Sequence, residues 1–158
     1  MTDEERRDIV VRAAHEWVGT PFRKGYPRKQ VSADCSSFIL AVCNEAGLLK
    51  EIPTIDRHPR DFGAHGAPDH FLRDQFLRVL ETSVADEVLV SEAEVSDLRR
   101  GDILVFSLYK TRNEHHLGIY VGDGKVAHCV NRIGVLVQNL EPMWAKRIVR
   151  VVRWELTR

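Results

Sequence analysis

Apolar residues recur at helical spacing near the start of the chain. Thr2 is followed three residues later by Glu5, which matches a capping box, where each side chain binds the other residue's backbone N–H. Residues 19–21, Gly-Thr-Pro, are a stop signal. The pattern therefore predicts a first helix that ends at Gly19. Its apolar face consists of Ile9, Val10, Ala13, Ala14, Trp17 and Val18.

A second helix is predicted from Asp34 to Gly47. Asp34 is a favoured N-cap residue, residues 38–43 are continuously apolar, and Gly47 closes the segment. At about 13 residues the run is long for a strand, so we interpret it as a buried helix.

The middle of the chain contains a predicted loop followed by a predicted helix. Residues 51–68 contain three prolines and two glycines, which indicates a long surface loop. The next segment has the spacing of an amphipathic helix. Its positions are Phe71, Leu72, Gln75, Phe76, Val79 and Leu80.

After residues 100–102, Arg-Gly-Asp, the pattern indicates strands. The predicted strands are Ile103–Leu108, His116–Val121, Lys125–Val130, Val135–Gln138 and Ile148–Trp154. Helices followed by antiparallel strands are typical of an α+β fold, in which N-terminal helices pack on a sheet. We expect a meander sheet that is mainly antiparallel and has five to six strands.

Two registers are open for the hairpin around residues 122–124, Gly-Asp-Gly. If all three residues are loop, His116 pairs with Val130, and His128 is a diagonal neighbour on the same face. If only Asp123-Gly124 forms the turn, the register slips by one. His128 then points to the other face unless a bulge corrects it.

Length and composition narrow the class of protein. The 158 residues fit one domain, residues 1–158. The 23 basic residues are balanced by 23 acidic ones, which argues against a nucleic-acid partner.

No apolar run approaches the ~18 residues that span a bilayer, so no membrane association is expected. The N-terminus shows no secretory signal, which predicts a protein that is cytoplasmic as synthesised.

The three cysteines form an odd set without a CxxC pair, which excludes a fully paired disulfide framework. Cys35 follows the N-cap of the second helix, where free N–H groups and the helix dipole favour a thiolate. An imidazole held beside it, oriented by a second polar group, would complete a nucleophilic site. The alternative is that Cys35 and His128 only pack in the core and that His116 is a solvated residue at the start of its strand.

Several blocks of sequence occur in an order that resembles the NlpC/P60 family of papain-like cell-wall cysteine peptidases. They are Trp-Val-Gly-Thr-Pro-Phe at 17–22, Asp-Cys-Ser-Ser-Phe at 34–38, Gly-Asp-Ile-Leu-Val-Phe at 101–106, His-Leu-Gly-Ile-Tyr-Val-Gly at 116–122 and Val-Ala-His at 126–128. The resemblance covers about residues 9–138 and implies the papain-like NlpC/P60 fold.

The resemblance also implies roles for individual residues. Cys35 takes the position of the nucleophile, His116 that of the general base, and His128 that of the polar residue that orients the imidazole. Asp34 and Ser36 would help to bind the amine end of a short peptide. No metal or other cofactor is implied, although a zinc site built from Cys35, His116 and His128 is formally possible.

Two positions depart from the family's pattern. The family usually has Tyr after Gly-Thr-Pro, with its hydroxyl in the site, whereas this chain has Phe22. Tyr26, from the following loop, is a candidate substitute. The family's usual Gly two residues after the nucleophile is Ser37 here. We therefore assign Phe22 and Tyr26 to the expected substrate-binding region.

The resemblance therefore implies that the protein is a cysteine endopeptidase that cuts peptidoglycan stem peptides next to a D-γ-glutamyl or diamino-acid residue. Two alternatives are a thiol-dependent acyltransferase or amidase of the same fold, and a wall-peptide-binding module without catalysis. A compact chain with no visible signal also resembles the family variant associated with phage tails and gene-transfer particles. In that variant the particle delivers the enzyme to the wall.

Overall fold

The computed structural model describes residues 1–53, 77–107 and 116–157. The helices are α1 (Asp3–Glu16), α2 (Cys35–Glu45), α3 (Leu77–Ser83) and α4 (Pro142–Ala145). The strands are β1 (Val88–Ala93), β2 (Ile103–Phe106), β3 (His116–Gly122), β4 (Lys125–Val130), β5 (Gly134–Asn139) and β6 (Ile148–Leu156). Most of the predicted loop at 51–68, the beginning of the predicted third helix and Leu108 lie outside the described residues.

The strands form one six-stranded antiparallel sheet in the order β1-β6-β2-β3-β4-β5. The prediction of an α+β fold is confirmed, but the simple meander is wrong. Strands β2 to β5 are neighbours in sequence order, whereas β6 returns to pair with both β1 and β2. Strand β1 was not predicted, because it is an edge strand whose residues are mostly exposed or half-buried, Leu89 among them.

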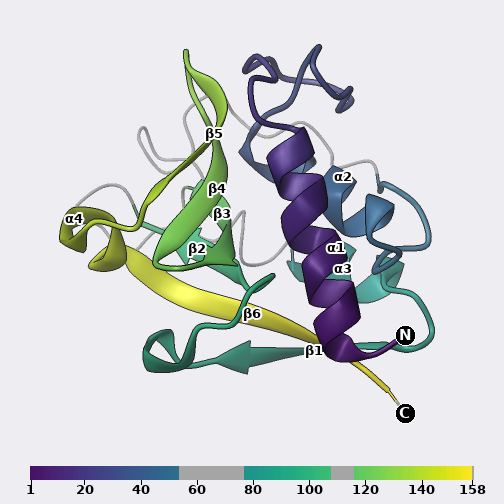
Figure 1. Ribbon diagram of the computed structural model, residues 1–158. Coiled ribbons are helices and arrows are strands. Elements are labelled where there is room, and N and C mark those ends of the chain that lie inside the picture. Colours follow the sequence, from purple (N-terminus) through teal and green to yellow (C-terminus); the bar gives the residue numbers. More distant parts are fainter. Residues whose placement is uncertain (54–76, 108–115, 158) are drawn as a thin grey trace.

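The two faces of the sheet are covered differently. The main core joins α1 and α2 to side chains such as Ile103, Leu117 and Cys129. A smaller cluster on the other face contains Leu104, Phe106, Val126 and Val151, and Trp144 of α4 packs against it. In Figure 1, α1 and α2 lie to the right of strands β3–β5 and α4 lies to the left. The sheet thus separates a helix-covered face from a face with aromatic cover.

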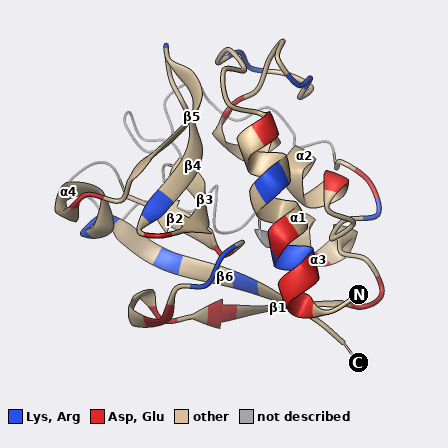
Figure 2. Ribbon diagram, viewed as in Figure 1, with Lys and Arg blue, Asp and Glu red and all other residues tan. Residues whose placement is uncertain are grey.

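Both long helices begin as their sequences predict. The Thr2 hydroxyl accepts from Glu5 N at 3.2 Å, and Thr2 N donates to the Glu5 carboxylate at 2.7 Å. Acidic residues crowd this first turn of α1, where the helix dipole favours negative charge (Figure 2). Asp34 caps α2, and Cys35 is the first helical residue.

The β3–β4 hairpin combines features of both predicted registers. Asp123 and Gly124 have φ values of 52° and 68°, as a two-residue type I′ turn requires, and Gly122 pairs with Lys125. A bulge at Val121 then shifts the pairing so that Tyr120 faces Val126. This bulge restores the register that brings both hairpin histidines to one face.

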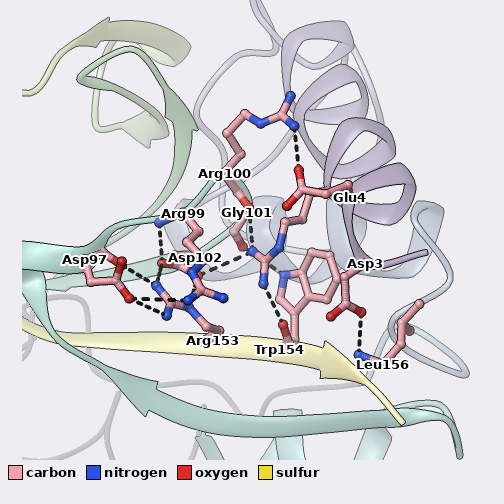
Figure 3. A network of polar contacts seen from close by, with 11 residues as sticks. Asp3, Glu4, Asp97, Arg99, Arg100, Gly101, Asp102, Arg153, Trp154 and Leu156 are labelled. Carbon is pink, nitrogen blue, oxygen red and sulfur yellow. Dashed lines mark hydrogen bonds and ion pairs between the residues drawn. The ribbon is translucent and has the colours of Figure 1, made fainter. Parts of the chain in front are cut away.

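A network of buried charges ties α1 to the sheet (Figure 3). Asp102, which is fully buried, accepts from Arg153 Nε at 3.0 Å and from Arg153 Nη2 at 2.7 Å. Arg7 Nη1 lies 3.6 Å from the same carboxylate, and the guanidinium stacks on Trp154 at 4.6 Å. Because these partners come from α1, β6 and the segment before β2, the network joins distant parts of the chain.

The segment before α2 is fixed against β5. Gly19 N donates to Val135 O at 2.9 Å, and Val135 N donates to Thr20 O at 2.9 Å. Gly134 has a φ of 98°, and a Cβ there would lie 2.3 Å from Thr20 O. Only glycine fits this close approach. Among the described residues, no helix has the length and apolar character needed to cross a membrane.

Candidate active site

Cys35 occupies the position that the sequence predicts, but its thiol is buried and in its neutral form. Burial raises the pKa of Cys35 to about 12, and the charge of Asp34 adds to this effect, followed by that of Cys129. The backbone N–H groups of Leu117 and Ser36 act in the opposite direction. The helix-start effect that the sequence predicts is present in the Ser36 N–H, but desolvation outweighs it, so the pKa of Cys35 is raised overall.

The two histidines form a continuous hydrogen-bonded chain with a residue of β5. His116 Nε2 lies 2.8 Å from His128 Nδ1, and His128 Nε2 lies 2.9 Å from Gln138 Oε1. His128 is fully buried and His116 is 6% exposed. The predicted pairing of an imidazole with an orienting polar group is thus present, and Gln138 extends it by one member.

Aromatic rings enclose the histidine pair. Trp144 meets His128 edge-on with 5.0 Å between ring centroids and lies 6.0 Å from His116, and the Phe106 ring lies 5.9 Å from His116. Burial lowers the pKa of His116 to about 3, and the neighbouring His128 adds to this effect. Burial also lowers the pKa of His128, whereas the hydrogen bond that His128 donates to Gln138 raises it. Both imidazoles are therefore neutral at neutral pH.

Helix α2, which carries Cys35, and the two imidazole rings pack on different faces of the sheet. Leu117 and Cys129 belong to the main core beside α2, whereas His116 and His128 pack with the aromatic residues of the opposite face. Cys35 meets β3 at the Leu117 N–H, one residue from His116. In the described part of the chain, no hydrogen bond joins its sulfur to either ring. Such bonds often tighten only when substrate binds.

Asp34 and Ser36 serve the local structure of the helix start. Asp34 Oδ1 accepts from Ser37 N at 2.8 Å and from the Ser36 hydroxyl at 3.1 Å. The Ser37 hydroxyl in turn accepts from Asp34 N at 2.9 Å and completes a capping box. The serine that replaces the family's usual glycine thus stabilises α2. The roles of Asp34 and Ser36 in substrate binding stay predictions.

Phe22 and Tyr26 lie on the loop that leads to Cys35. Phe22 is half-buried against the main core, and its backbone forms a parallel bridge with Ala33. Tyr26 is 65% exposed, and its carbonyl accepts from the Ser32 hydroxyl at 3.3 Å. The loop geometry fixes the backbone before the nucleophile, while a substrate contact of either ring stays a prediction.

Three residues around the histidines were not identified from the sequence. Gln138 and Phe106 fall within predicted strands but carry no predicted role, and the sequence predicts no role for Trp144. Strand periodicity could have indicated Gln138. Leu136 lies opposite His128, and Gln138 follows two positions later, so its polar side chain lies on the same face as His128. No such signal identifies Trp144, because tertiary packing alone brings α4 onto the hairpin.

The remaining two cysteines are buried. Cys43 is buried within α2, and Cys129 is buried on β4, where its sulfur donates to Ala33 O at 3.3 Å. Across residues 1–53, 77–107 and 116–157, no three His, Cys, Asp or Glu side chains form a group that could hold a metal ion. Cys35, His116 and His128 therefore do not form a zinc site in this arrangement.

Sequence comparison relates the chain to cell-wall enzymes. It is 26% identical over 134 residues to the murein DD-endopeptidase MepS/murein LD-carboxypeptidase of Escherichia coli K12, covering 84% of this chain and 54% of that protein. It is 39% identical over 146 residues to the peptidoglycan DL-endopeptidase CwlO of Bacillus licheniformis, covering 92% of this chain and 25% of that protein. The chain thus spans about half or less of these two relatives.

Structural comparison shows the same fold. RipD of Mycobacterium tuberculosis, described as a non-catalytic NlpC/p60 domain protein adapted to peptidoglycan binding, superposes with a TM-score of 0.56 at 17% identity. The match covers 94% of this chain and 96% of that one. The model of the NlpC/P60 family matches residues 19–153, which include the candidate nucleophile and both histidines. Given the extent of this match, the chain belongs to the NlpC/P60 family.

Proposed function

We propose that this protein is a cysteine endopeptidase that hydrolyses amide bonds in peptidoglycan stem peptides. The observation that carries the proposal is the position of Cys35. Its thiol lies at the start of α2 against the N–H of Leu117, next to the residue that begins the His116–His128–Gln138 chain. The family's peptidoglycan hydrolases supply the substrate class.

The proposed reaction starts from a neutral pair. As the Cys35 sulfur attacks the scissile carbonyl carbon, its proton passes to His116, and a tetrahedral oxyanion forms. The Cys35 backbone N–H, at the open first turn of α2, donates to this oxyanion. The C–N bond then breaks while His116 returns the proton to the leaving amine. Water, deprotonated by His116, finally releases the acyl group and restores the thiol.

The bond that we propose lies next to a D-γ-glutamyl or diamino-acid residue. The names of the two relatives specify different bonds, DD and DL, so they support peptidoglycan peptides as a class rather than one bond. Asp34 accepts both of its local hydrogen bonds at Oδ1, and its Oδ2 is the oxygen that we assign to a substrate ammonium group. Delivery by a phage-tail or gene-transfer particle stays a prediction from the sequence.

The direct test is mass spectrometry of the products from defined muropeptides. Wild-type protein should release fragments cut at one bond, and Cys35→Ala should release none. Cys43→Ala is the matched control, since it removes another buried thiol of the same helix and should cut like wild type. Cleavage by Cys35→Ala at the wild-type rate would refute the proposal. Addition of an amine acceptor to the same assay separates hydrolysis from acyl transfer.

A second candidate is a domain that binds wall peptides without cutting them. It is favoured by the buried neutral thiol, by the absence of a thiol–imidazole hydrogen bond among the described residues, and by Phe22 in place of tyrosine. RipD, of the same fold, is described as such a protein. If this candidate holds, calorimetry should detect equal muropeptide binding by wild type and Cys35→Ala, and mass spectrometry should detect no cleavage by either protein.

A further inference from the structure

We propose that Gln138 is a positioning residue that determines which nitrogen of His116 carries the proton, and that it acts through His128. The inference rests on the proposed function for its catalytic consequence. Its structural part concerns only the protonation pattern of the two rings and can be tested without substrate.

The sheet register explains how Gln138 reaches His128. His128 pairs with Leu136 and Val126 pairs with Gln138, so Gln138 is the diagonal neighbour of His128 on the same face. Diagonal neighbours are about 7–8 Å apart, a distance that a long side chain spans. The observed distance between His128 Nε2 and Gln138 Oε1 is 2.9 Å.

The proton positions follow from the number of donors and acceptors along the chain. Gln138 Oε1 is only an acceptor, so His128 Nε2 must donate to it. In a neutral ring, His128 Nδ1 is then unprotonated and accepts from His116 Nε2. His116 therefore carries its proton on Nε2, and its Nδ1 holds the free lone pair. That nitrogen is the one left to take a proton from Cys35.

The surroundings of Gln138 fit this orientation of its amide. The NH₂ group needs two acceptors, whereas His128 Nε2 offers one site. Gln138 also lines an open hollow together with Lys125, Val137, Asn139 and Glu141, where water can accept from the NH₂ group. With the carbonyl turned inward and the NH₂ group outward, both ends of the amide can form hydrogen bonds.

The hydrogen-bonded series His116–His128–Gln138 has uncharged neighbours. Among the described residues, the aromatic and hydrogen-bonding contacts of the two rings, apart from their contact with each other, are with Phe106, Trp144 and Gln138, and no charged side chain contributes to the pKa shift of either ring. None of these contacts is with a charged group that could favour one tautomer. The Gln138 carbonyl oxygen, a neutral acceptor, is therefore what favours one tautomer of His128 over the other. Loss of that acceptor should leave both tautomers populated.

The first test is nitrogen-15 NMR of the imidazole rings in the free protein. Wild type should show protonated Nε2 on both His116 and His128 at neutral pH. Gln138→Leu should shift both rings toward a mixture of tautomers, and Gln138→Glu, which keeps an acceptor oxygen, should retain the wild-type pattern. Asn139→Ala, on the same strand and hollow, is the matched control and should change nothing. Protonated Nδ1 on wild-type His116, or unchanged tautomers in Gln138→Leu, would overturn the inference.

The second test measures muropeptide cleavage by the same variants. Gln138→Leu should lower kcat by about 10- to 100-fold with little change in KM, as is typical when an orienting partner is lost. At a pH where His128 is neutral, Gln138→Glu should keep most of kcat. On acidification its kcat should fall at a higher pH than that of wild type, because a carboxylate stabilises a protonated His128 whose Nδ1 can no longer accept from His116. If Gln138→Leu does not fold, Gln138→Glu still tests the tautomer. Inactive wild-type protein with the expected tautomers would refute the proposed function alone, whereas equal kcat in Gln138→Leu would refute the role of Gln138 in catalysis.

Discussion

At the scale of single residues, the candidate nucleophile and base are both held neutral by desolvation. The pKa of Cys35 is raised to about 12 and that of His116 is lowered to about 3, each chiefly by burial. A resting thiolate–imidazolium pair is therefore disfavoured. If the protein is a peptidase, it must transfer the proton while the thiol attacks, and substrate binding must bring the two groups together.

The pH dependence of alkylation tests this resting state. Because the thiol pKa is raised, the thiolate fraction of Cys35 is small at pH 7 and grows about tenfold with each pH unit up to pH 9. The rate of alkylation by iodoacetamide at Cys35, read by peptide mapping, should rise in parallel without a plateau. Asp34→Asn removes a nearby negative charge, so it should lower the pKa and speed alkylation at each pH, while Asp123→Asn should not. A plateau below pH 7 in wild type would indicate a preformed ion pair.

At the scale of secondary structure elements, the start of α2 and the β3–β4 hairpin bring the site together. The capping box of Asp34 and Ser37 fixes the first turn of α2, so the Cys35 side chain has a defined position against β3. The bulge at Val121 then allows a tight Asp-Gly turn while keeping His116 and His128 on one face. Either element alone presents one half of the candidate site.

The capping box predicts how α2 responds to substitution at Asp34. Asp34→Ala should lower the free energy of unfolding by about 1 kcal/mol, because it removes the acceptor for Ser37 N. Asp34→Asn keeps an acceptor oxygen and should change stability by only a few tenths of a kcal/mol. Urea unfolding of both variants measures the difference. Equal losses for the two would show that charge, rather than the cap, stabilises the helix start.

At the scale of the whole molecule, the buried charges around Asp102 hold α1 on the sheet. Arg7 comes from α1 and Arg153 from β6, and both face the same fully buried carboxylate. Burial lowers the pKa of Arg7, while Asp102 opposes this effect. The carboxylate is thus the common counter-ion for two guanidinium groups that lie far apart in sequence.

Removal of this charge should destabilise the fold as a whole. Asp102→Asn leaves Arg7 and Arg153 with less compensation, and the expected loss is about 3–5 kcal/mol in the free energy of unfolding. Chemical denaturation measures it, with Asp123→Asn, at the exposed turn, as the control for a change of one charge. A loss below about 1 kcal/mol would mean that solvent or other groups compensate the two arginines.

The sequence by itself determined the features that depend on neighbours along the chain. The capping box of Thr2, the N-cap at Asp34, the buried run of α2 and the hairpin strands follow from local hydrogen bonding and apolar periodicity, and the structure confirms them. The motif order also indicated Cys35, His116 and His128 as candidate site residues, and the structure contains the pairing of the two rings.

Only the tertiary structure decided what depends on contacts between distant segments. The place of β6 between β1 and β2, the cover of Trp144 over the histidines and the contact of Gln138 with His128 are set by packing and register. Burial likewise outweighs the helix-start effect on the pKa of Cys35, because desolvation depends on all surrounding atoms, whereas the helix start is visible in local sequence. The sequence names the reactive groups, and the folded environment sets their protonation.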